Sequence, residues 1–162
     1  MNIVTMSDDL ISETSNFATK VFVDYYSDLI NDKQAKYMAN LFLTETKIKE
    51  LKDYGAIFRL VYDKKQIVGF TEYIKEENKV FLSKLYVAQQ KRHTGIGRLM
   101  FEDCINYAKT NELNKIYLTV NKGNLPSIEI YKHLGFKQID AVVNDIGGGY
   151  VMDDYIMEYT IK

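Results

Sequence analysis

VFLSKLYVAQQKRHTGIGRLMFEDCINYAKTN, residues Val80–Asn111, combines a strand, a glycine-containing turn and a helix. Its first part, Val80–Val87, is dense in β-branched and aromatic side chains, which favour a strand. After a polar loop, Gly95-Ile96-Gly97 leads into a segment in which apolar residues recur at helical spacing. Glycines let the backbone approach an anion closely, and the free N–H groups and positive dipole end of a helix attract it. The stretch therefore predicts a phosphate-binding site.

The residues that follow the glycines exclude two common phosphate-binding loops. A Walker loop requires Gly-Lys-Ser/Thr, whereas Gly97 is followed by Arg98-Leu99. A dinucleotide fingerprint requires a third small residue three positions after Gly97, where Met100 stands. A methionine there would block the close contact between helix and strand that the fingerprint needs. Neither loop type fits this sequence.

The remaining pattern, Arg92-x-x-Gly95-x-Gly97 directly after a strand, resembles the acetyl-CoA pyrophosphate loop of the GCN5-related N-acetyltransferases (GNAT). A second block at residues 124–136, NLPSIEIYKHLGF, resembles the later N-x-x-A-x-x-x-Y-x-x-x-G-F pattern of that family, with Ser127 in place of the usual alanine. The two blocks lie in the family's order and at a plausible separation. The chain is therefore identified as a member of the GNAT superfamily, similar to its bacterial small-amine and polyamine acetyltransferases.

The resemblance implies an α/β (α+β) fold, the GNAT fold: a central mixed, mostly antiparallel sheet of six to seven strands flanked by about four helices. Hydrophobic patterns predict the element order β-α-α-β-β-β-α-β-α-β-β. Ser7 is expected to cap the first helix, and the second helical region, 33–53, to be interrupted near Thr44. In the family the strand carrying Leu85–Val87 splays from the strand 116–120, which exposes backbone groups along its edge.

Composition sets the class of protein. A chain of 162 residues, 46% hydrophobic and 27% charged, is expected to form one domain over residues 1–162. The net charge of −1 argues against nucleic acid or an anionic membrane as a partner. The absence of a membrane-length apolar run and of a signal-peptide pattern favours a cytoplasmic location. Two histidines and one cysteine, Cys104, predict neither a disulfide framework nor a metal site. Cys104 is expected to be buried and inert, and a homodimer is left open.

The resemblance further implies acetyl-CoA as co-substrate. Its diphosphate is expected on the backbone of residues 92–98, and its pantetheine arm is expected to pair with the edge of the strand 85–87. The backbone N–H of Leu85 would stabilise the tetrahedral oxyanion. Asn124 would bond the pantetheine arm, with plain helix capping as the alternative. The residues expected to contact the co-substrate are Leu85, Tyr86, Val87, Arg92, His93, Thr94, Gly95, Ile96, Gly97, Arg98, Asn124, Ser127 and Tyr131.

Tyr131 is the expected catalytic acid together with Leu85 as oxyanion donor. In similar enzymes a tyrosine here protonates the departing thiolate, which a phenol with a pKa of about 10 can do. The alternative is a core aromatic. An alkyl amine is neutral in only about one molecule in 10³ near pH 7.5, so it also needs a base. Residues 81–84 contain no acid, in contrast to family members with a strand glutamate. A water chain to Glu72, or a partly neutral acceptor, is expected instead.

The acceptor is expected to be a small primary amine, with polyamines first. The acidic residues of both terminal regions would suit a cation, although a solvated surface is the simpler explanation: Asp24, Asp28, Asp32, Asp145, Asp153 and Asp154. Adjacent strand residues face opposite sides, so the last two are not expected to act as a catalytic pair. Tyr25-Tyr26 belong either to the core or to the acceptor pocket. A protein N-terminus or lysine acetyltransferase, and a non-catalytic acyl-CoA-binding module, remain alternatives.

Overall fold

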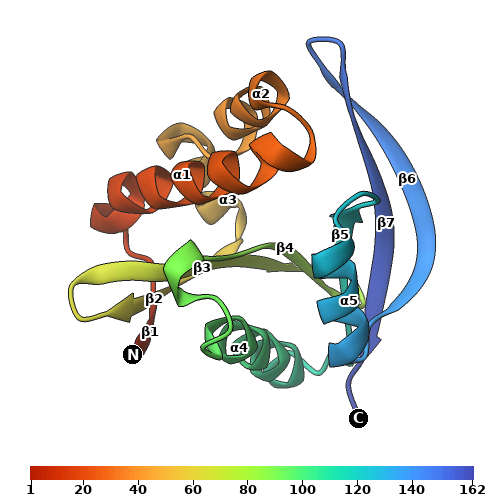
Figure 1. Cartoon of the computed structure of the whole chain (residues 1–162). Helices are drawn as coiled ribbons and strands as arrows, with labels where there is room; N and C mark the ends of the chain where they lie inside the picture. The colour runs from red at the N-terminus through yellow and green to blue at the C-terminus, as the bar shows by residue number, and fades with distance from the viewer.

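One sheet of seven strands organises the chain, and helices cover both of its faces (Figure 1). A computed structural model describes all of residues 1–162. The strands are β1 (Asn2–Thr5), β2 (Ile57–Asp63), β3 (Gln66–Lys75), β4 (Val80–Val87), β5 (Lys115–Asn121), β6 (Lys137–Gly147) and β7 (Tyr150–Thr160). The helices are α1 (Ile11–Leu29), α2 (Asp32–Phe42), α3 (Glu45–Tyr54), α4 (Ile96–Thr110) and α5 (Leu125–Leu134). The strand order in the sheet is β1-β2-β3-β4-β5-β7-β6.

The pairing of β4 with β5 is the only parallel one, because α4 crosses from one strand to the other. The two strands pair only at Val80↔Ile116 and Phe81↔Tyr117, and beyond these residues they separate. On its other side β4 follows β3 along its whole length, with one irregularity: Glu72 pairs with Lys84 while the next residue of β3 pairs with Leu82. The extra residue on β4 is a bulge, which bends a strand. The predicted mixed sheet and splayed strand pair are confirmed.

The two faces of the sheet carry separate hydrophobic cores. Helices α1, α2 and α3 cover one face, and α4 and α5 cover the other (Figure 1). Phe58, Leu60 and Phe70 are among the buried residues under the first group, whereas Ile116 and Met157 are buried under the second. Since alternate residues of a strand face opposite sides, this division assigns every position on the strands to one face.

A glycine on β3 brings α4 close to the sheet. A Cβ added at Gly69 would lie 2.8 Å from Ile96 Cγ2 and 3.2 Å from Met100 Sδ, so any side chain there would push the helix away. The sequence argument that Met100 prevents a close helix–strand contact is therefore incomplete, because the small residue lies on the strand and Met100 packs against it. The N-terminus of α4 is thereby held against the edge where the sheet opens.

Five α-helices are present, one more than the approximate expectation. The region 33–53 forms two of them, because the Thr44 side chain accepts a hydrogen bond from Lys47 N at 3.1 Å and starts α3. The interruption predicted near Thr44 is confirmed. None of the five helices is both long and apolar enough to cross a membrane. Cys104 is buried in α4, and burial raises the pKa of its thiol, as expected for an inert cysteine.

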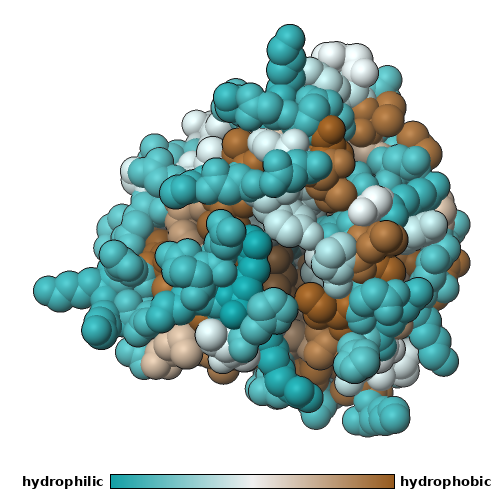
Figure 2. Space-filling view, viewed as in Figure 1, coloured by the Kyte–Doolittle hydropathy of each residue, from teal (hydrophilic) through white to brown (hydrophobic).

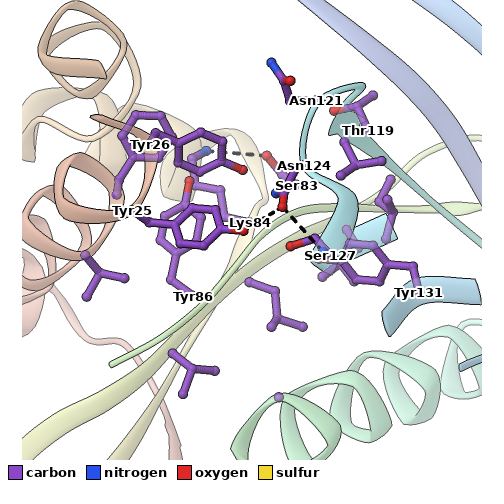
Figure 3. Close-up of a pocket in the computed structure, with 18 of the residues that line it drawn as sticks. Tyr25, Tyr26, Ser83, Lys84, Tyr86, Thr119, Asn121, Asn124, Ser127 and Tyr131 are labelled. Atoms are coloured by element: carbon purple, nitrogen blue, oxygen red, sulfur yellow. Dashed lines mark hydrogen bonds between the residues drawn. The ribbon is translucent and has the colours of Figure 1, made fainter. Parts of the chain in front are cut away.

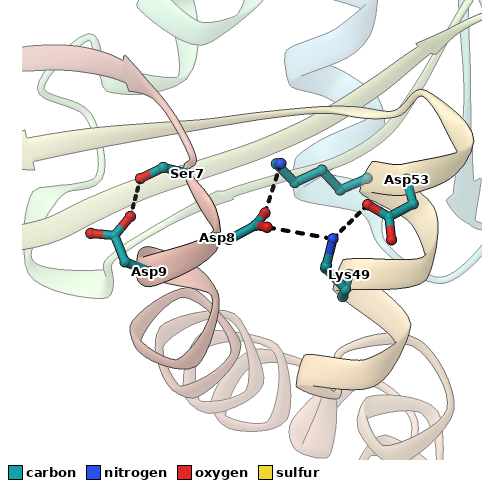
Figure 4. A network of polar contacts seen from close by, with 6 residues as sticks. Ser7, Asp8, Asp9, Lys49 and Asp53 are labelled. Carbon is teal, nitrogen blue, oxygen red and sulfur yellow. Dashed lines mark hydrogen bonds and ion pairs between the residues drawn. The ribbon is translucent and has the colours of Figure 1, made fainter.

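The predicted cap at Ser7 is wrong. Ser7 makes no capping bond to the backbone and precedes a short 3₁₀ turn, Asp8–Leu10, so α1 begins only at Ile11. Its hydroxyl instead bonds the side chain of Asp9 (Figure 4). Asp8 forms ion pairs with two lysines of α3, Lys49 at 3.4 Å and Lys52 at 2.8 Å. This acidic residue connects the turn to a neighbouring helix, a tertiary contact that local capping rules do not consider.

Candidate active site

A cavity of about 730 Å³ lies where β4 and β5 diverge, between α1 and α2 on one side and α5 on the other. The surface is hollowed at this place, with hydrophobic residues visible along the hollow (Figure 2). All of the residues predicted to contact acetyl-CoA line the cavity except Thr94 and Gly95, which lie in the exposed turn before α4. Tertiary structure thus brings together the two sequence blocks from which the site was predicted.

The N-terminus of α4 presents free backbone donors to the cavity. Gly95 adopts a left-handed conformation with φ +91°, which a glycine adopts without strain. The first helical hydrogen bond runs from Leu99 N to Gly95 O at 3.0 Å, so the N–H groups of Ile96, Gly97 and Arg98 precede the helical ladder. A Cβ at Gly97 would meet only side-chain atoms of the β4 strand, at 3.8 Å or more. This is the geometry of an anion site.

The basic side chains around this helix start are not equivalent. The Arg92 guanidinium lies over the ring of Tyr25, 5.1 Å from its centroid. Lys91 is ion-paired with Asp63 at 2.6 Å. Arg98 forms only an exposed pair with Glu102, four residues further along the same helix, and such surface pairs contribute little to stability. His93 is exposed, with φ +64°.

The free edge of β4 faces the gap in the sheet. Ala88 N donates to Val68 O at 2.9 Å, which identifies this position as a hydrogen-bonded pair of β3 and β4. Because hydrogen-bonded positions alternate along an antiparallel pair, the N–H and C=O groups of Leu85 and Val87 point away from β3. They therefore point toward β5, from which β4 has already separated. An extended chain with amide groups could pair with this edge.

Asn124 caps α5, and its side-chain oxygen is fully used within the protein. Asn124 Oδ1 accepts a hydrogen bond from Tyr25 Oη at 2.6 Å and one from Ser127 N at 3.4 Å (Figure 3). The residue is only 1% exposed. The capping role is confirmed, and it uses only the oxygen of the amide; the contact with α1 was not foreseen. What Asn124 retains for a ligand is its NH₂ group.

Tyr131 lies on α5 with its ring held and its hydroxyl unpaired. The ring packs edge-to-face against Phe136, with centroids 5.6 Å apart. The hydroxyl forms no hydrogen bond to the protein, and the residue lines the cavity (Figure 3). Burial, with a smaller effect of nearby Tyr25, raises the pKa of Tyr131 to about 12, so the phenol keeps its proton at neutral pH. Tyr131 can therefore pack with its ring and still offer its hydroxyl proton to the cavity.

Tyr25 and Tyr26 both line the cavity, and Tyr26 also packs against the core under α1, so the pair is not simply core. Their rings are nearly perpendicular, with centroids 5.1 Å apart, and Tyr26 stacks on Phe22 at 4.5 Å. Burial raises the pKa of Tyr26. Helix α1 therefore contributes an aromatic wall to the side of the cavity opposite α5 (Figure 3).

Glu72 does not line the cavity. It is 3% exposed and forms an ion pair with Lys84, its cross-strand neighbour, with Nζ and Oε1 2.5 Å apart. Lys84 does line the cavity. Because the carboxylate of Glu72 already neutralises a buried lysine, removal of Glu72 would leave that charge unpaired, which is costly. Glu72 is therefore the ion-pair partner of Lys84. To accept a proton through a water chain it would have to give up that pair.

A sequence model of the Acetyltransferase (GNAT) family matches residues 18–136. The protein belongs to the GNAT family. The probable N-acetyltransferase san of Drosophila melanogaster is 28% identical over an alignment of 97 residues, which covers 57% of this chain and 53% of the fly protein. The chain thus matches about half the length of that curated relative.

Solved structures share the same fold. The PaiA N-acetyltransferase of Thermoplasma acidophilum, in complex with coenzyme A, superposes with a TM-score of 0.80 at 20% identity, covering 99% of both chains. The ribosomal-protein-alanine N-acetyltransferase of Brucella melitensis superposes with a TM-score of 0.70 at 18% identity, covering 99% of this chain and 100% of that one. At these identities the similarity shows the GNAT fold and does not distinguish acceptors.

Asp154 of this GNAT protein was named from the sequence only as one of six acidic residues that favour a cationic acceptor, and the structure sets it apart from the other five. It lies on β7, is 4% exposed and lines the cavity. Its carboxylate forms no hydrogen bond or ion pair within the chain, and burial raises its pKa from the usual 3.8 to about 6, with nearby Asp153 adding to the rise. The alternation of β7 contained the signal: Met152 and Ile156 are apolar residues on the same face, and Asp154 stands between them.

The other acidic residues that suggested a cationic acceptor do not line this cavity. Asp24 pairs with Lys20 at 2.8 Å, Asp32 with Lys36 at 3.0 Å and Asp153 with Lys122 at 2.8 Å. Asp28 and Asp145 are exposed, and the latter accepts a hydrogen bond from Gly147 N. For these five the solvated-surface explanation is correct. No three His, Cys, Asp or Glu side chains come together as a metal-binding group would require.

The buried carboxylate predicts that Asp154→Asn stabilises the protein at neutral pH. The raised pKa means that the folded state disfavours the charged form, so the cost is absent below pH 3.8 and complete above about pH 6. Two pKa units correspond to roughly 3 kcal/mol at most. Urea denaturation should show the variant more stable than wild type by about 1–3 kcal/mol at pH 7 and by much less at pH 4. Asp153→Asn, at the neighbouring exposed carboxylate, is the matched control and should gain much less, because Asp153 is the smaller cause of the raised pKa and its own pair with Lys122 is exposed. An Asp154→Asn protein no more stable than wild type at pH 7 would contradict the burial argument.

Proposed function

We propose that this protein, over residues 1–162 as one domain, is an N-acetyltransferase that transfers the acetyl group of acetyl-CoA directly to a primary amine. The observation that carries the proposal is the open edge of β4, bounded at one end by the free N–H groups of α4 and at the other by the unpaired hydroxyl of Tyr131. Membership of the GNAT family supports the same chemistry. An anion site, an amide-pairing edge and a proton donor are the three parts that this transfer needs.

Each part of acetyl-CoA has a complementary group in the cavity. The backbone N–H groups of residues 92–98, with the side chains of Arg92, His93 and Thr94 nearby, suit the diphosphate. The edge at Leu85–Val87 suits the extended amides of the pantetheine arm. The NH₂ group of Asn124, whose oxygen is already engaged, would donate to a carbonyl of that arm, with Ser127 beside it.

The chemical step follows from the same positions. The amine nitrogen attacks the thioester carbonyl, and the charge on its oxygen is stabilised by the N–H of Leu85, which points into the gap. The C–S bond then breaks, and Tyr131 gives its hydroxyl proton to the thiolate. The aromatic wall of Tyr25 and Tyr26 keeps water from this region and leaves room for an acceptor on the α1 and α2 side.

A small primary amine, with polyamines among the first to test, is the proposed acceptor, and a protein N-terminus or lysine side chain is the second candidate. Named relatives include a ribosomal-protein-alanine N-acetyltransferase and the probable N-acetyltransferase san, so both classes deserve a direct comparison. A non-catalytic acyl-CoA-binding module is disfavoured because a binder has no use for an unpaired Tyr131 hydroxyl beside the open edge.

Coenzyme A should stabilise the folded protein. At 100 times its Kd the ligand adds about 2.7 kcal/mol, which for a domain of this size raises Tm by roughly 5–10 °C. Gly97→Val should abolish the shift, because its side chain would occupy the space in front of the helix N–H groups. The unliganded variant should still fold, since a Cβ there makes only ordinary contacts with the protein. A wild-type Tm that does not move in saturating coenzyme A would rule out the proposed co-substrate site.

Tyr131→Phe separates acid catalysis from packing. The variant keeps the ring that packs on Phe136 and loses only the hydroxyl. Binding of acetyl-CoA, measured by the same Tm shift, should be nearly unchanged, whereas kcat should fall by about 10²-fold or more. If kcat stays within a factor of two while chemistry limits the rate, Tyr131 serves packing alone.

An amine panel tests the acceptor class. Thiol release is measured at one acetyl-CoA concentration with spermidine, spermine, cadaverine, 2-phenylethylamine and a lysine-containing peptide. A small amine should give the highest kcat/KM, because the cavity of about 730 Å³ is lined mainly by hydrophobic residues and is large enough for a compact molecule. Turnover of the peptide with every small amine silent would favour the protein-acetyltransferase candidate instead.

A further inference from the structure

We propose that Asp154 is the group that binds the ammonium of the acceptor and takes its proton before the nitrogen attacks the thioester. This inference rests on the proposed N-acetyltransferase function and identifies the acceptor end of the same cavity. Neither the family pattern nor the two sequence blocks assigns a role to this residue.

Asp154 lies on the face of the sheet that is covered by α1 and α2, where we place the acceptor. Along β7, Met152 packs with the core under α1 and α2, whereas Met157 belongs to the core under α4 and α5. Asp154 is two residues from Met152 and therefore faces α1 and α2. Its partner across the sheet is Asn121 at the end of β5, just before α5. The N-terminus of α4 lies on the opposite face, so the acceptor and the diphosphate would enter from different sides (Figure 1).

The surroundings leave this carboxylate without a partner. Asp154 is the single acidic side chain lining the cavity, and it receives no hydrogen bond from the protein. A buried charge normally has a partner, because burial without one is costly. The basic residues of the lining, Lys84, Lys91, Arg92 and Arg98, repel a cation. An ammonium group entering the cavity therefore has one favourable position, beside Asp154.

The titratable groups around Asp154 leave it ionised at neutral pH. On its own strand, Asp153 raises its pKa, and Lys122 at the end of β5, paired with Asp153, lowers it slightly. From α1 the facing group is Tyr26, whose raised pKa keeps it neutral. Tyr131 of α5 lines the same cavity and is neutral for the same reason. With its pKa raised by burial to about 6, the carboxylate is charged at pH 7 and is a stronger base than an exposed aspartate.

The proton balance closes with the groups already named. The acceptor RNH₃⁺ gives one proton to the Asp154 carboxylate and becomes RNH₂. The nitrogen lone pair forms the C–N bond, and the thioester C=O electrons move to oxygen. The C–S bond breaks as the oxyanion collapses, the sulfur gains a proton from Tyr131, and the nitrogen loses its second proton, which restores the phenol. Asp154 returns its proton to water, so the products are the amide, the free thiol and one H⁺.

This arrangement changes the expected dependence of the rate on pH. Two states matter here: ionised Asp154 with the ammonium, and neutral Asp154 with the free amine. Both contain the same number of protons, so their ratio does not change with pH. For wild type, kcat/KM should therefore be level between a limb near pH 6 and the pKa of the amine, about 10 for an alkyl amine. Without Asp154 only the rare free amine reacts, and kcat/KM should rise about tenfold per pH unit. The partly neutral acceptor that the sequence leaves open, with no carboxylate base, corresponds to that second case.

The test compares kcat/KM from pH 5.5 to 9.5 for wild type, Asp154→Asn and Asp153→Asn, using the most active amine of the panel. Asp154→Asn should lose about 10²-fold at pH 7 and then rise about tenfold per unit, while the Tm shift in coenzyme A is retained. Asp153→Asn, which faces the opposite side and contacts Lys122, should keep the level profile.

Three other results would overturn the inference. A wild-type rate that already rises tenfold per unit from pH 7 to 9 contradicts it without any variant, so the test remains decisive even if Asp154→Asn fails to fold. An Asp154→Asn profile that stays level contradicts it as well. Wild type that binds coenzyme A but releases no thiol with any amine would overturn the proposed function, and this inference with it, which is distinct from an active enzyme with the wrong profile.

Discussion

The separation of β4 from β5 is the constraint on which the rest of the structure depends. After two paired positions the strands diverge, so the backbone groups of Leu85 and Val87 lie at an inner edge of the sheet without a neighbouring strand. Unpaired backbone groups inside a protein are costly unless something else satisfies them. A ligand with amide groups would complete the sheet at this edge, so that binding and folding would use the same kind of backbone hydrogen bonds.

Other features of the fold hold this opening in position. The bulge at the middle of β4 bends the strand while its pairing with β3 continues. Gly69 brings α4 against β3, which aims the free N–H groups of the helix at the opening. On the other side, the hydrogen bond between Tyr25 and Asn124 connects α1 to the start of α5 across the cavity. Each contact joins segments that are distant in sequence, so the width of the opening is a property of the whole fold.

Electrostatics divides the cavity into two ends. Basic side chains and the helix dipole lie around the start of α4, where an anion is expected, and a single carboxylate, Asp154, lies on the side proposed for the acceptor. Leaving that carboxylate unpaired costs stability at neutral pH, because burial disfavours its charged form. Glu72 has the opposite arrangement, since Lys84 neutralises it within the sheet. The two buried acids thus differ in whether a basic partner neutralises them. A buried acid without such a partner, with a shifted pKa, is a feature that often marks a functional site.

Sequence by itself determined the family and the mixed sheet with its splayed strands, and it predicted a region for binding a phosphate group that lines the cavity in the structure. These depend on local patterns: period-two and period-3.6 hydrophobicity, and glycines placed at a helix start. It also singled out Tyr131 and Asn124, since both lie in a recognisable block, and both line the cavity in the structure. Tertiary structure alone decided which polar groups are paired. Asp154 and Glu72 are both strand carboxylates in the sequence, but only packing shows that one meets a lysine across the sheet and the other faces the cavity. The partner of a buried charge comes from a different strand or helix, and no local pattern contains that information.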